Sequence, residues 1–215
     1  MKALAAALAF LVLTGISLAQ NTAEAEAAYT RTITQRSTTI VEALAVADTA
    51  QSNRVLNVLI NQYRTLNAWH STNDATLKAL KKKNDDAAKT EAAKVRATLK
   101  PIHDQFLQDL AAAGMSPTQI ETVKDRMTYG KLKVTYDAYC EIMPNLTDAQ
   151  KVRIKELLTE AREEAMDGGS ADEKSDIFNR YKGKINNYLT AEGHNVGQAF
   201  KDWNARKKAT APAAK

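Results

Sequence analysis

Three stretches in the second half of the chain have the pattern of a helix start, and they restrict the fold more than any other feature. Ser116, Thr147 and Ser170 each offer a hydroxyl at the N-cap position, and glutamine or glutamate follows three residues later. In such a capping box the two side chains satisfy backbone N–H groups that the first helical turn leaves unpaired. Pro117 adds the residue preferred at the first helical position. The pattern predicts helices that begin at these three points.

Apolar residues recur at helical spacing along most of the chain. Ile177, Tyr181 and Ile185, for example, follow one another at intervals of four, which places them on one helix face. Glycine and proline number only 8 and 4, which disfavours a sheet with many turns. We therefore predict an all-α fold, a single bundle-like domain of six to eight helices.

The first half of the chain is less clearly punctuated than the second. One helix is expected near residues 24–47, and Asp48 is expected to cap the next one. The polar segment 73–92 is expected to hold a loop. A third helix is predicted from about 91 to 113, where Pro101 kinks or restarts it. Gly114 is expected to end that helix in the left-handed conformation, and a last helix is expected over 195–207.

The N-terminus has the pattern of a secretory signal peptide. Lys2 precedes an apolar run that ends near Leu18, and Ser17-Leu18-Ala19 offers the small residues that signal peptidase reads. We predict cleavage after Ala19, so that residues 1–19 are the signal peptide, 20–208 the helical domain and 209–215 a disordered tail. The mature protein is expected to be extracytoplasmic, either periplasmic or secreted. No later stretch has membrane-spanning length, so no transmembrane segment is expected in it.

The charge distribution argues against a nucleic-acid partner, and the cysteine content argues against a disulfide. The net charge is +5, but the basic residues are scattered and an exported protein rarely meets nucleic acid, so no nucleic-acid partner is expected. Cys140 is the only cysteine, which excludes an intrachain disulfide. Its neighbours Tyr139, Ile142 and Met143 indicate a small buried residue, because a catalytic thiol needs a positive charge nearby.

No sequence motif indicates a metal or a cofactor. His70, His103 and His194 lack a second histidine, glutamate or cysteine at the i+3 or i+4 spacing of a helical metal site. Loops that bind phosphate, dinucleotide or calcium, and the nucleophile elbow of hydrolases, also lack a counterpart. We therefore expect no metal and no cofactor.

Several blocks resemble a family of secreted bacterial proteins catalogued only as a domain of unknown function. The blocks are QYRTLNAWH (62–70), VKDRMTYG (123–130), TYDAY (135–139), AREEAMDGGSADEKSDIF (161–178) and YKGKINNYL (181–189). The chain departs from the family pattern at Arg126, where glycine is usual, and at Ser71, where aspartate is usual. The resemblance implies no particular activity, but its members are associated with polysaccharide-degrading bacteria.

A shorter stretch resembles the Spy and CpxP group of periplasmic chaperones and stress sensors. LTDAQKVRIKELL (146–158) is similar to the LTxxQ motif of that group, and MSPTQIETV (115–123) is a weaker second copy. The physical content of this motif is a capped helix start, which many unrelated helices share.

A candidate ligand-binding surface follows from the family blocks and from local propensity. Adjacent asparagines 186 and 187 are poor helix formers, and residues that oppose local propensity are candidates for a site. The predicted site residues are Asp125, Tyr129, Tyr136, Arg162, Asp167, Tyr181, Lys182 and Asn187. The alternative is that these side chains belong to ordinary amphipathic helices, with the tyrosines packed in the core.

Two functions from different classes remain open. The sequence favours a non-enzymatic protein of the cell envelope that binds an unknown protein or carbohydrate ligand, for example as a chaperone or sensor. The alternative is a carbohydrate-active enzyme, or an accessory protein in polysaccharide utilisation. A deep pocket lined by Asp, Glu, Arg and Tyr would favour the enzyme, and an exposed apolar groove would favour the chaperone.

Overall fold

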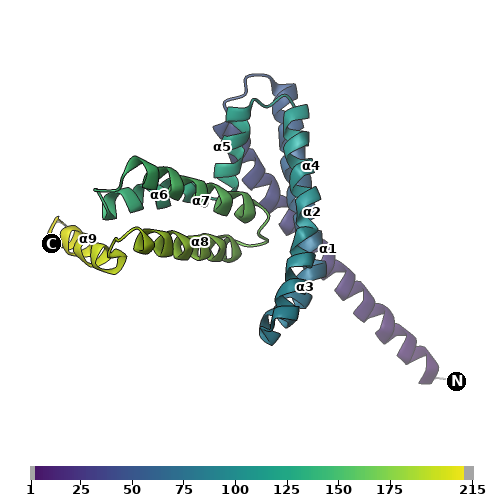
Figure 1. Ribbon diagram of the computed structural model, residues 1–215. Coiled ribbons are helices and arrows are strands. Elements are labelled where there is room, and N and C mark those ends of the chain that lie inside the picture. The colour runs from purple at the N-terminus through teal and green to yellow at the C-terminus, as the bar shows by residue number, and fades with distance from the viewer. Residues whose placement is uncertain (1–2, 211–215) are drawn as a thin grey trace. The chain divides into compact units, whose positions relative to one another are not determined.

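The computed structural model describes residues 3–210, with side chains for residues 23–209. Within this range every regular element is a helix, which confirms the all-α fold class. The elements are α1 (Ala3–Ala43), α2 (Thr49–Lys83), α3 (Asp86–Ala97), α4 (Leu99–Ala112), α5 (Pro117–Met127), α6 (Lys131–Ile142), α7 (Asp148–Met166), α8 (Ala171–Ala191) and α9 (Val196–Thr210), as Figure 1 shows. The chain forms two compact units, Met1–Tyr63 and Arg64–Lys215, and the boundary falls inside α2.

The first unit consists of α1 and the beginning of α2. Asp48 accepts a hydrogen bond from the Ala50 backbone N–H at 2.9 Å, so the predicted cap of α2 is confirmed. Ile33 and Ile40 on α1 are buried, and so is Leu44, which directly follows the helix. The Tyr29 hydroxyl donates to the Tyr63 carbonyl at 2.8 Å and ties α1 to α2.

The segment 73–92 holds a loop of two residues only, Asn84 and Asp85, and is helical on both sides of it. Helix α2 continues to Lys83, and α3 begins at Asp86 after Asp85, which caps it by accepting from the Ala88 N–H at 2.7 Å. Leu77 and Ala88 are the buried residues of this segment, and most of the others are exposed. A helix with so narrow an apolar stripe gives little periodic signal, so the sequence does not show how short the loop is.

Pro101 marks a restart of the helix, as predicted. Helix α3 ends at Ala97 and α4 begins at Leu99, so Pro101 lies in the first turn, where a missing N–H leaves no hydrogen bond unmade. The predicted left-handed Gly114 is confirmed by its φ of 89°. The capping boxes at Ser116 and Thr147 are both complete.

The third predicted box is only half formed. Ser170 accepts from the Glu173 N–H at 3.0 Å and caps α8. The Glu173 carboxylate, however, accepts from the N–H of Gly169 at 2.9 Å and not from that of Ser170. Glu173 therefore stabilises the α7–α8 corner one residue before the N-cap.

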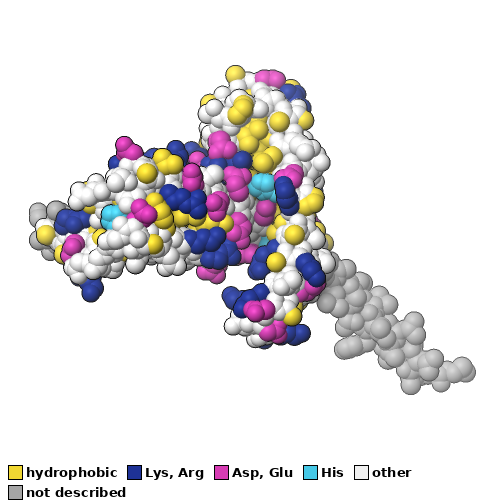
Figure 2. All heavy atoms as spheres, viewed as in Figure 1, with side chains coloured by type: hydrophobic (Ala, Val, Ile, Leu, Met, Phe, Trp, Pro, Cys, Tyr) yellow, Lys and Arg dark blue, Asp and Glu magenta, His cyan; other side chains and the backbone are white. Residues whose placement is uncertain are grey.

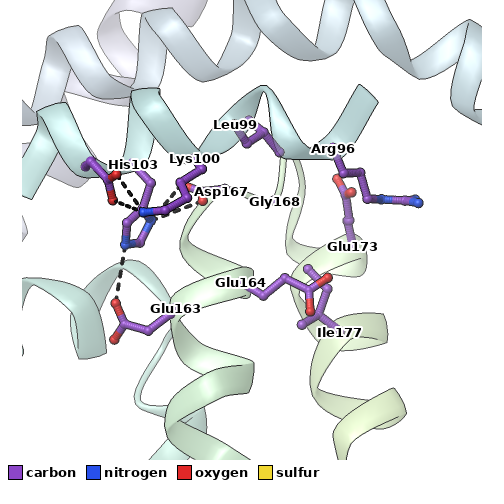
Figure 3. Close-up of a pocket in the computed structure, with 11 residues that line it drawn as sticks. Arg96, Leu99, Lys100, His103, Glu163, Glu164, Asp167, Gly168, Glu173 and Ile177 are labelled. Carbon is purple, nitrogen blue, oxygen red and sulfur yellow. Dashed lines mark hydrogen bonds and ion pairs between the residues drawn. The ribbon is translucent and has the colours of Figure 1, made fainter. Parts of the chain in front are cut away.

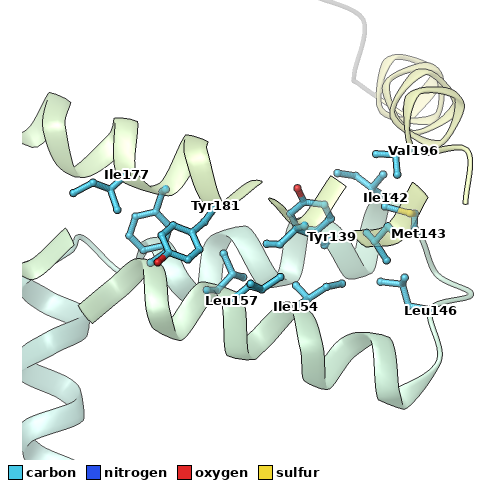
Figure 4. Packing of buried hydrophobic residues seen from close by; sticks show 14 of the residues in the cluster. Tyr139, Ile142, Met143, Leu146, Ile154, Leu157, Ile177, Tyr181 and Val196 are labelled. Atoms are coloured by element: carbon cyan, nitrogen blue, oxygen red, sulfur yellow. The ribbon is translucent and has the colours of Figure 1, made fainter. Parts of the chain in front are cut away.

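The main apolar core of the second unit lies between α6, α7 and α8, with α9 closing one end (Figures 1 and 4). Ile154, Leu158, Ile185 and Leu189 have no measurable exposure. Figure 4 shows Tyr139 and Tyr181 among these apolar side chains. This core fixes α7 and α8 side by side, and both helices reach the corner at residues 167–170.

Two sequence-based predictions concern the ends of the chain. The predicted signal peptide, 1–19, lies where side chains are outside the described residues, and its cleavage stays a prediction. The predicted tail, 209–215, lies outside them except at residues 209 and 210, which end α9. Among the described residues, no helix combines the length and apolar character needed to cross a bilayer.

Candidate functional site: a charged cleft beside two histidines

Asp167 lies at the end of α7 and contacts two histidines from distant helices. It follows the last residue of α7 and occupies the C-cap position. Its backbone carbonyl oxygen lies 2.8 Å from Nε2 of His70 on α2. Its carboxylate lies 3.1 Å from Nδ1 of His103 on α4. The end of α7 is therefore joined to α2 and α4 through polar side chains.

The second nitrogen of each imidazole also faces an acceptor. His70 Nδ1 lies 2.9 Å from the Asp74 carboxylate. His103 Nε2 lies 3.4 Å from the Glu163 carboxylate, and Figure 3 shows the ring between its two partners. Because a neutral imidazole carries one N–H only, each ring donates to both acceptors only when it is protonated. This geometry favours the protonated form of both rings.

The pKa shifts of the two histidines agree with the protonated form. The Asp167 and Glu163 carboxylates outweigh burial and raise the pKa of His103 from 6.5 to about 9. Burial by itself lowers the pKa of His70, but the bonds to the Asp167 carbonyl and the Asp74 carboxylate outweigh it, and the pKa lies above 6.5. Both rings are therefore stabilised as cations.

Arg162 extends the charged network to α5. Its side chain is 5 % exposed, and Nη1 donates to Asp125 at 2.8 Å. Nη2 donates to Glu121 and, at 3.1 Å, to Glu163. These bonds outweigh burial and raise the pKa of the guanidinium. A cation this deeply buried requires such partners, so Arg162 is fixed in place rather than available to a ligand.

Glu163 is the shared member of the network. Lys124 lies 3.0 Å from its carboxylate, on the same oxygen that faces His103. Burial by itself raises the pKa of Glu163, but the bonds from His103 and Lys124 outweigh it and hold the pKa at about 2. Glu163 is therefore ionised throughout the physiological range.

Two adjoining cavities open beside this network. The inner cavity, about 270 Å³, is drawn in Figure 3 and lies between α4, α7 and the start of α8. The outer cavity, about 970 Å³, continues between α2, α3 and α8. Arg96, Glu164, Glu173 and Ile177 line both, so the two form one cleft. Figure 2 shows Asp and Glu side chains gathered about a histidine on this face, with Lys and Arg side chains beside them.

Charge changes along the cleft. The inner cavity is richer in carboxylates, and its charged lining residues are Arg96, Lys100, His103, Asp104, Glu163, Glu164, Asp167 and Glu173. The outer cavity is richer in cations, and its charged lining residues are Lys81, Lys89, Arg96, Arg180, Glu164, Glu173 and Asp176. The apolar part of the lining is aliphatic, and aromatic side chains do not contribute to it.

The predicted site residues do not share one location. Asp125, Arg162 and Asp167 lie in the charged network, but only Asp167 lines the cleft. Tyr181 is in the core, as the alternative interpretation held. Tyr129, Tyr136, Lys182 and Asn187 do not line either cavity; Tyr129 is 52 % exposed, and Tyr136 packs on the outside of the core.

The adjacent asparagines have a structural explanation in part. Asn186 accepts a hydrogen bond from the Tyr139 hydroxyl at 2.7 Å, which ties α8 to α6. Asn187 is exposed. The presence of a poor helix former at Asn186 is therefore explained by this hydrogen bond between helices and does not require a ligand.

Sequence reasoning missed the two histidines and Arg96. Their shared partner Asp167 lies 97 residues from His70 and 64 from His103 in the sequence, although Asp74, the second partner of His70, lies only four residues away. One signal was present, because His70 ends the block QYRTLNAWH and Asp167 lies in AREEAMDGGSADEKSDIF. Among the described residues, no group of three or more His, Cys, Asp or Glu side chains is arranged to hold a metal ion.

Comparisons with known proteins agree with the block resemblance. The curated proteins include no match to this chain. The sequence model of one family, described as "Protein of unknown function (DUF3826)", matches residues 30–209. That range contains all the blocks quoted above, and it includes the cleft and both histidines. The chain therefore belongs to the DUF3826 family.

Proposed function

We propose that the protein is an exported, non-enzymatic binding protein of the cell envelope, and that its cleft takes a polar, hydroxyl-bearing ligand such as an oligosaccharide. The observation that carries this proposal is a cleft whose charged side chains are held by ion pairs between packed helices. Binding sites need polar groups held at fixed positions by packing and by further hydrogen bonds. His103 and Asp167 are held in that way by the network.

Protonation favours binding over acid–base catalysis. A general acid or base works best when its pKa lies near the working pH. Here the pKa of His103 is about 9 and that of Glu163 about 2, so at neutral pH both groups carry a fixed charge. Fixed charges orient a ligand and pair with its hydroxyls, but they exchange protons poorly.

The enzyme alternative predicts a different cleft chemistry. A glycoside hydrolase needs one carboxylic acid with a raised pKa to protonate the leaving group. The described cleft contains Asp, Glu and Arg but none of the tyrosines that the sequence placed at the site. We therefore rank the enzyme second, and product analysis separates the two functions.

Titration calorimetry with a panel of oligosaccharides tests the proposal. Glu164→Ala removes a carboxylate that lines both cavities and pairs with the exposed Arg180. Glu160→Ala is the matched control, because Glu160 lies one turn earlier on α7, is exposed and lines neither cavity. We expect the ligand found with the wild type to bind at least about tenfold more weakly to Glu164→Ala, equivalent to one lost charge-assisted hydrogen bond.

Two results would count against this function. Equal affinities of the two variants would place binding elsewhere, and the lack of any binding across the panel would remove carbohydrate as the ligand class. Mass spectrometry of the ligand after prolonged incubation gives the enzyme test. Shortened or unsaturated products would support the alternative.

A further inference from the structure

The outer cavity contains cations from three helices. Lys81 belongs to the last turn of α2, Lys89 and Arg96 to α3, and Arg180 to α8. Lys82 and Lys83 also belong to that last turn of α2. This end of the cleft is therefore the more basic one, whereas carboxylates predominate at the inner end.

Some of these cations already have partners. Arg180 pairs with Glu164 at 2.5 Å, and Lys89 pairs with Asp86 at 3.0 Å. Arg96 and Lys81 form no ion pair with any of the residues that the structure describes, although carboxylates line the same cavity. Figure 3 shows the Arg96 side chain extended away from α3, with its guanidinium beyond Glu173. Arg96 lies where the two cavities join.

A free guanidinium is suited to one class of ligand group. Its planar fork of N–H donors matches the two oxygens of a carboxylate, whereas a lysine acts as a point charge. At the inner end, five carboxylates stand against three cations, so the net charge there disfavours an anion, whereas carboxylate oxygens accept hydrogen bonds from neutral hydroxyls. The charge distribution thus favours a ligand whose anionic group lies in the outer cavity and whose hydroxyls lie in the inner cavity.

We infer that the ligand of this cleft is an acidic oligosaccharide, bound with a sugar carboxylate on Arg96 and Lys81 and with its hydroxyls toward the inner cavity. This inference rests on the proposed function and adds the class and the orientation of the ligand to it. The volume of the outer cavity, about 970 Å³, is at the upper end of the range for small-molecule sites, so it accommodates more than one sugar ring.

The test compares two ligands that differ only in charge. Calorimetry is run with a galacturonic acid pentamer and with the same pentamer fully methyl-esterified, which keeps the sugar rings and removes the anions. Wild-type protein is expected to bind the acidic pentamer at least about tenfold more tightly, with an affinity that falls as salt is added.

Variants on α3 assign the effect to Arg96. Arg96→Gln is expected to remove most of the preference for the acidic pentamer, and Arg96→Lys to restore part of it. Lys94→Gln is the matched control: Lys94 lies in the same last turn, is 70 % exposed and lines neither cavity. Its binding is expected to equal that of the wild type. Thermal melts of all three confirm that folding is unchanged.

The outcomes distinguish a failure of the acidic-ligand inference from a failure of the proposed binding function. Equal binding of the acidic and esterified pentamers, weakened by Glu164→Ala, would overturn the acidic ligand and leave the binding function in place. An unchanged preference in Arg96→Gln would overturn the assignment to Arg96. Binding of neither pentamer, nor of any other oligosaccharide, would overturn both.

Discussion

At the scale of single residues, Asp167 links α2 and α4 to the α7–α8 corner. Its carbonyl and its carboxylate each face a different histidine. Since all acceptors around the two rings are carbonyl or carboxylate oxygens, the arrangement is complete only when both histidines are protonated. The stability of this corner is therefore expected to depend on pH.

Replacing His103 by glutamine should make stability less dependent on pH. The pKa of His103 is raised in the folded protein from 6.5 to about 9. Its contribution is therefore fully present below pH 6.5 and is lost as the pH rises through about 9. We expect His103→Gln to lower the free energy of unfolding by about 1–2 kcal/mol near pH 6, and to match the wild type more closely near pH 10. Urea melts across this range measure it, and a difference that stays constant with pH would contradict the assignment.

Gly169 is constrained by the ring of His70. A Cβ atom at this position would lie 2.8 Å from His70 Cγ and 2.9 Å from Cδ2, closer than real Cβ atoms approach. The ring cannot move aside easily because both of its nitrogens are held. We expect Gly169→Ala to lower the free energy of unfolding by about 1–3 kcal/mol, the usual effect of overpacking.

Gly183 provides the control for this substitution. It lies inside α8, and a Cβ atom there would meet nothing within 4 Å. We expect Gly183→Ala to raise stability by about 0.5–1 kcal/mol, because alanine is the better helix former. Chemical denaturation of both variants decides the matter, and equal effects at the two positions would mean that the ring of His70 is not where the structure places it.

At the scale of helices, the starts and stops with side-chain or glycine signals were predictable from sequence. Ser116 and Thr147 form complete boxes, and Gly114 adopts the left-handed conformation. The end of α2 and the start of α3 were not predictable from apolar periodicity, because only Leu77 and Ala88 are buried there. Local hydrogen bonds leave a signature in a few adjacent residues, whereas an exposed helix leaves almost none.

The cap of α8 can be tested against a nearby serine. Ser170→Ala removes the hydroxyl that accepts from the Glu173 N–H and is expected to lower the free energy of unfolding by about 1 kcal/mol. Ser175 lies inside α8, and its hydroxyl donates to the Ala171 carbonyl. Ser175→Ala is expected to be neutral or slightly stabilising. A denaturation midpoint that is unchanged in Ser170→Ala would show that α8 begins at another residue.

At the scale of the whole chain, the fold class could be predicted but the cleft could not. The apolar stripes and the scarcity of glycine and proline are properties of the sequence itself. The cleft depends on α2, α3 and α4 meeting the α7–α8 corner, and its residues span Leu77 to Arg180. Nothing in the local pattern at Arg96 or His103 indicates which distant residues face them. Of the predicted site residues, Asp167 lines the cleft; it was predicted because it lies in a family block, and its partners were not predicted.

Export is the condition under which an extracellular ligand would meet this cleft, so the signal peptide has a direct bearing on function. Signal peptidase requires a small residue immediately before the cleaved bond, and Ala19 fills that position. We expect the full chain, expressed in a bacterial host, to appear outside the cytoplasm with Gln20 as its first residue. Ala19→Leu should leave the precursor uncleaved at this bond, whereas Ala23→Leu, past the cleavage point, should be processed normally. Mass spectrometry of the intact proteins distinguishes the products, and a wild-type protein that keeps Met1 in the cytoplasm would contradict export, because the cleft would then never face ligands outside the cell.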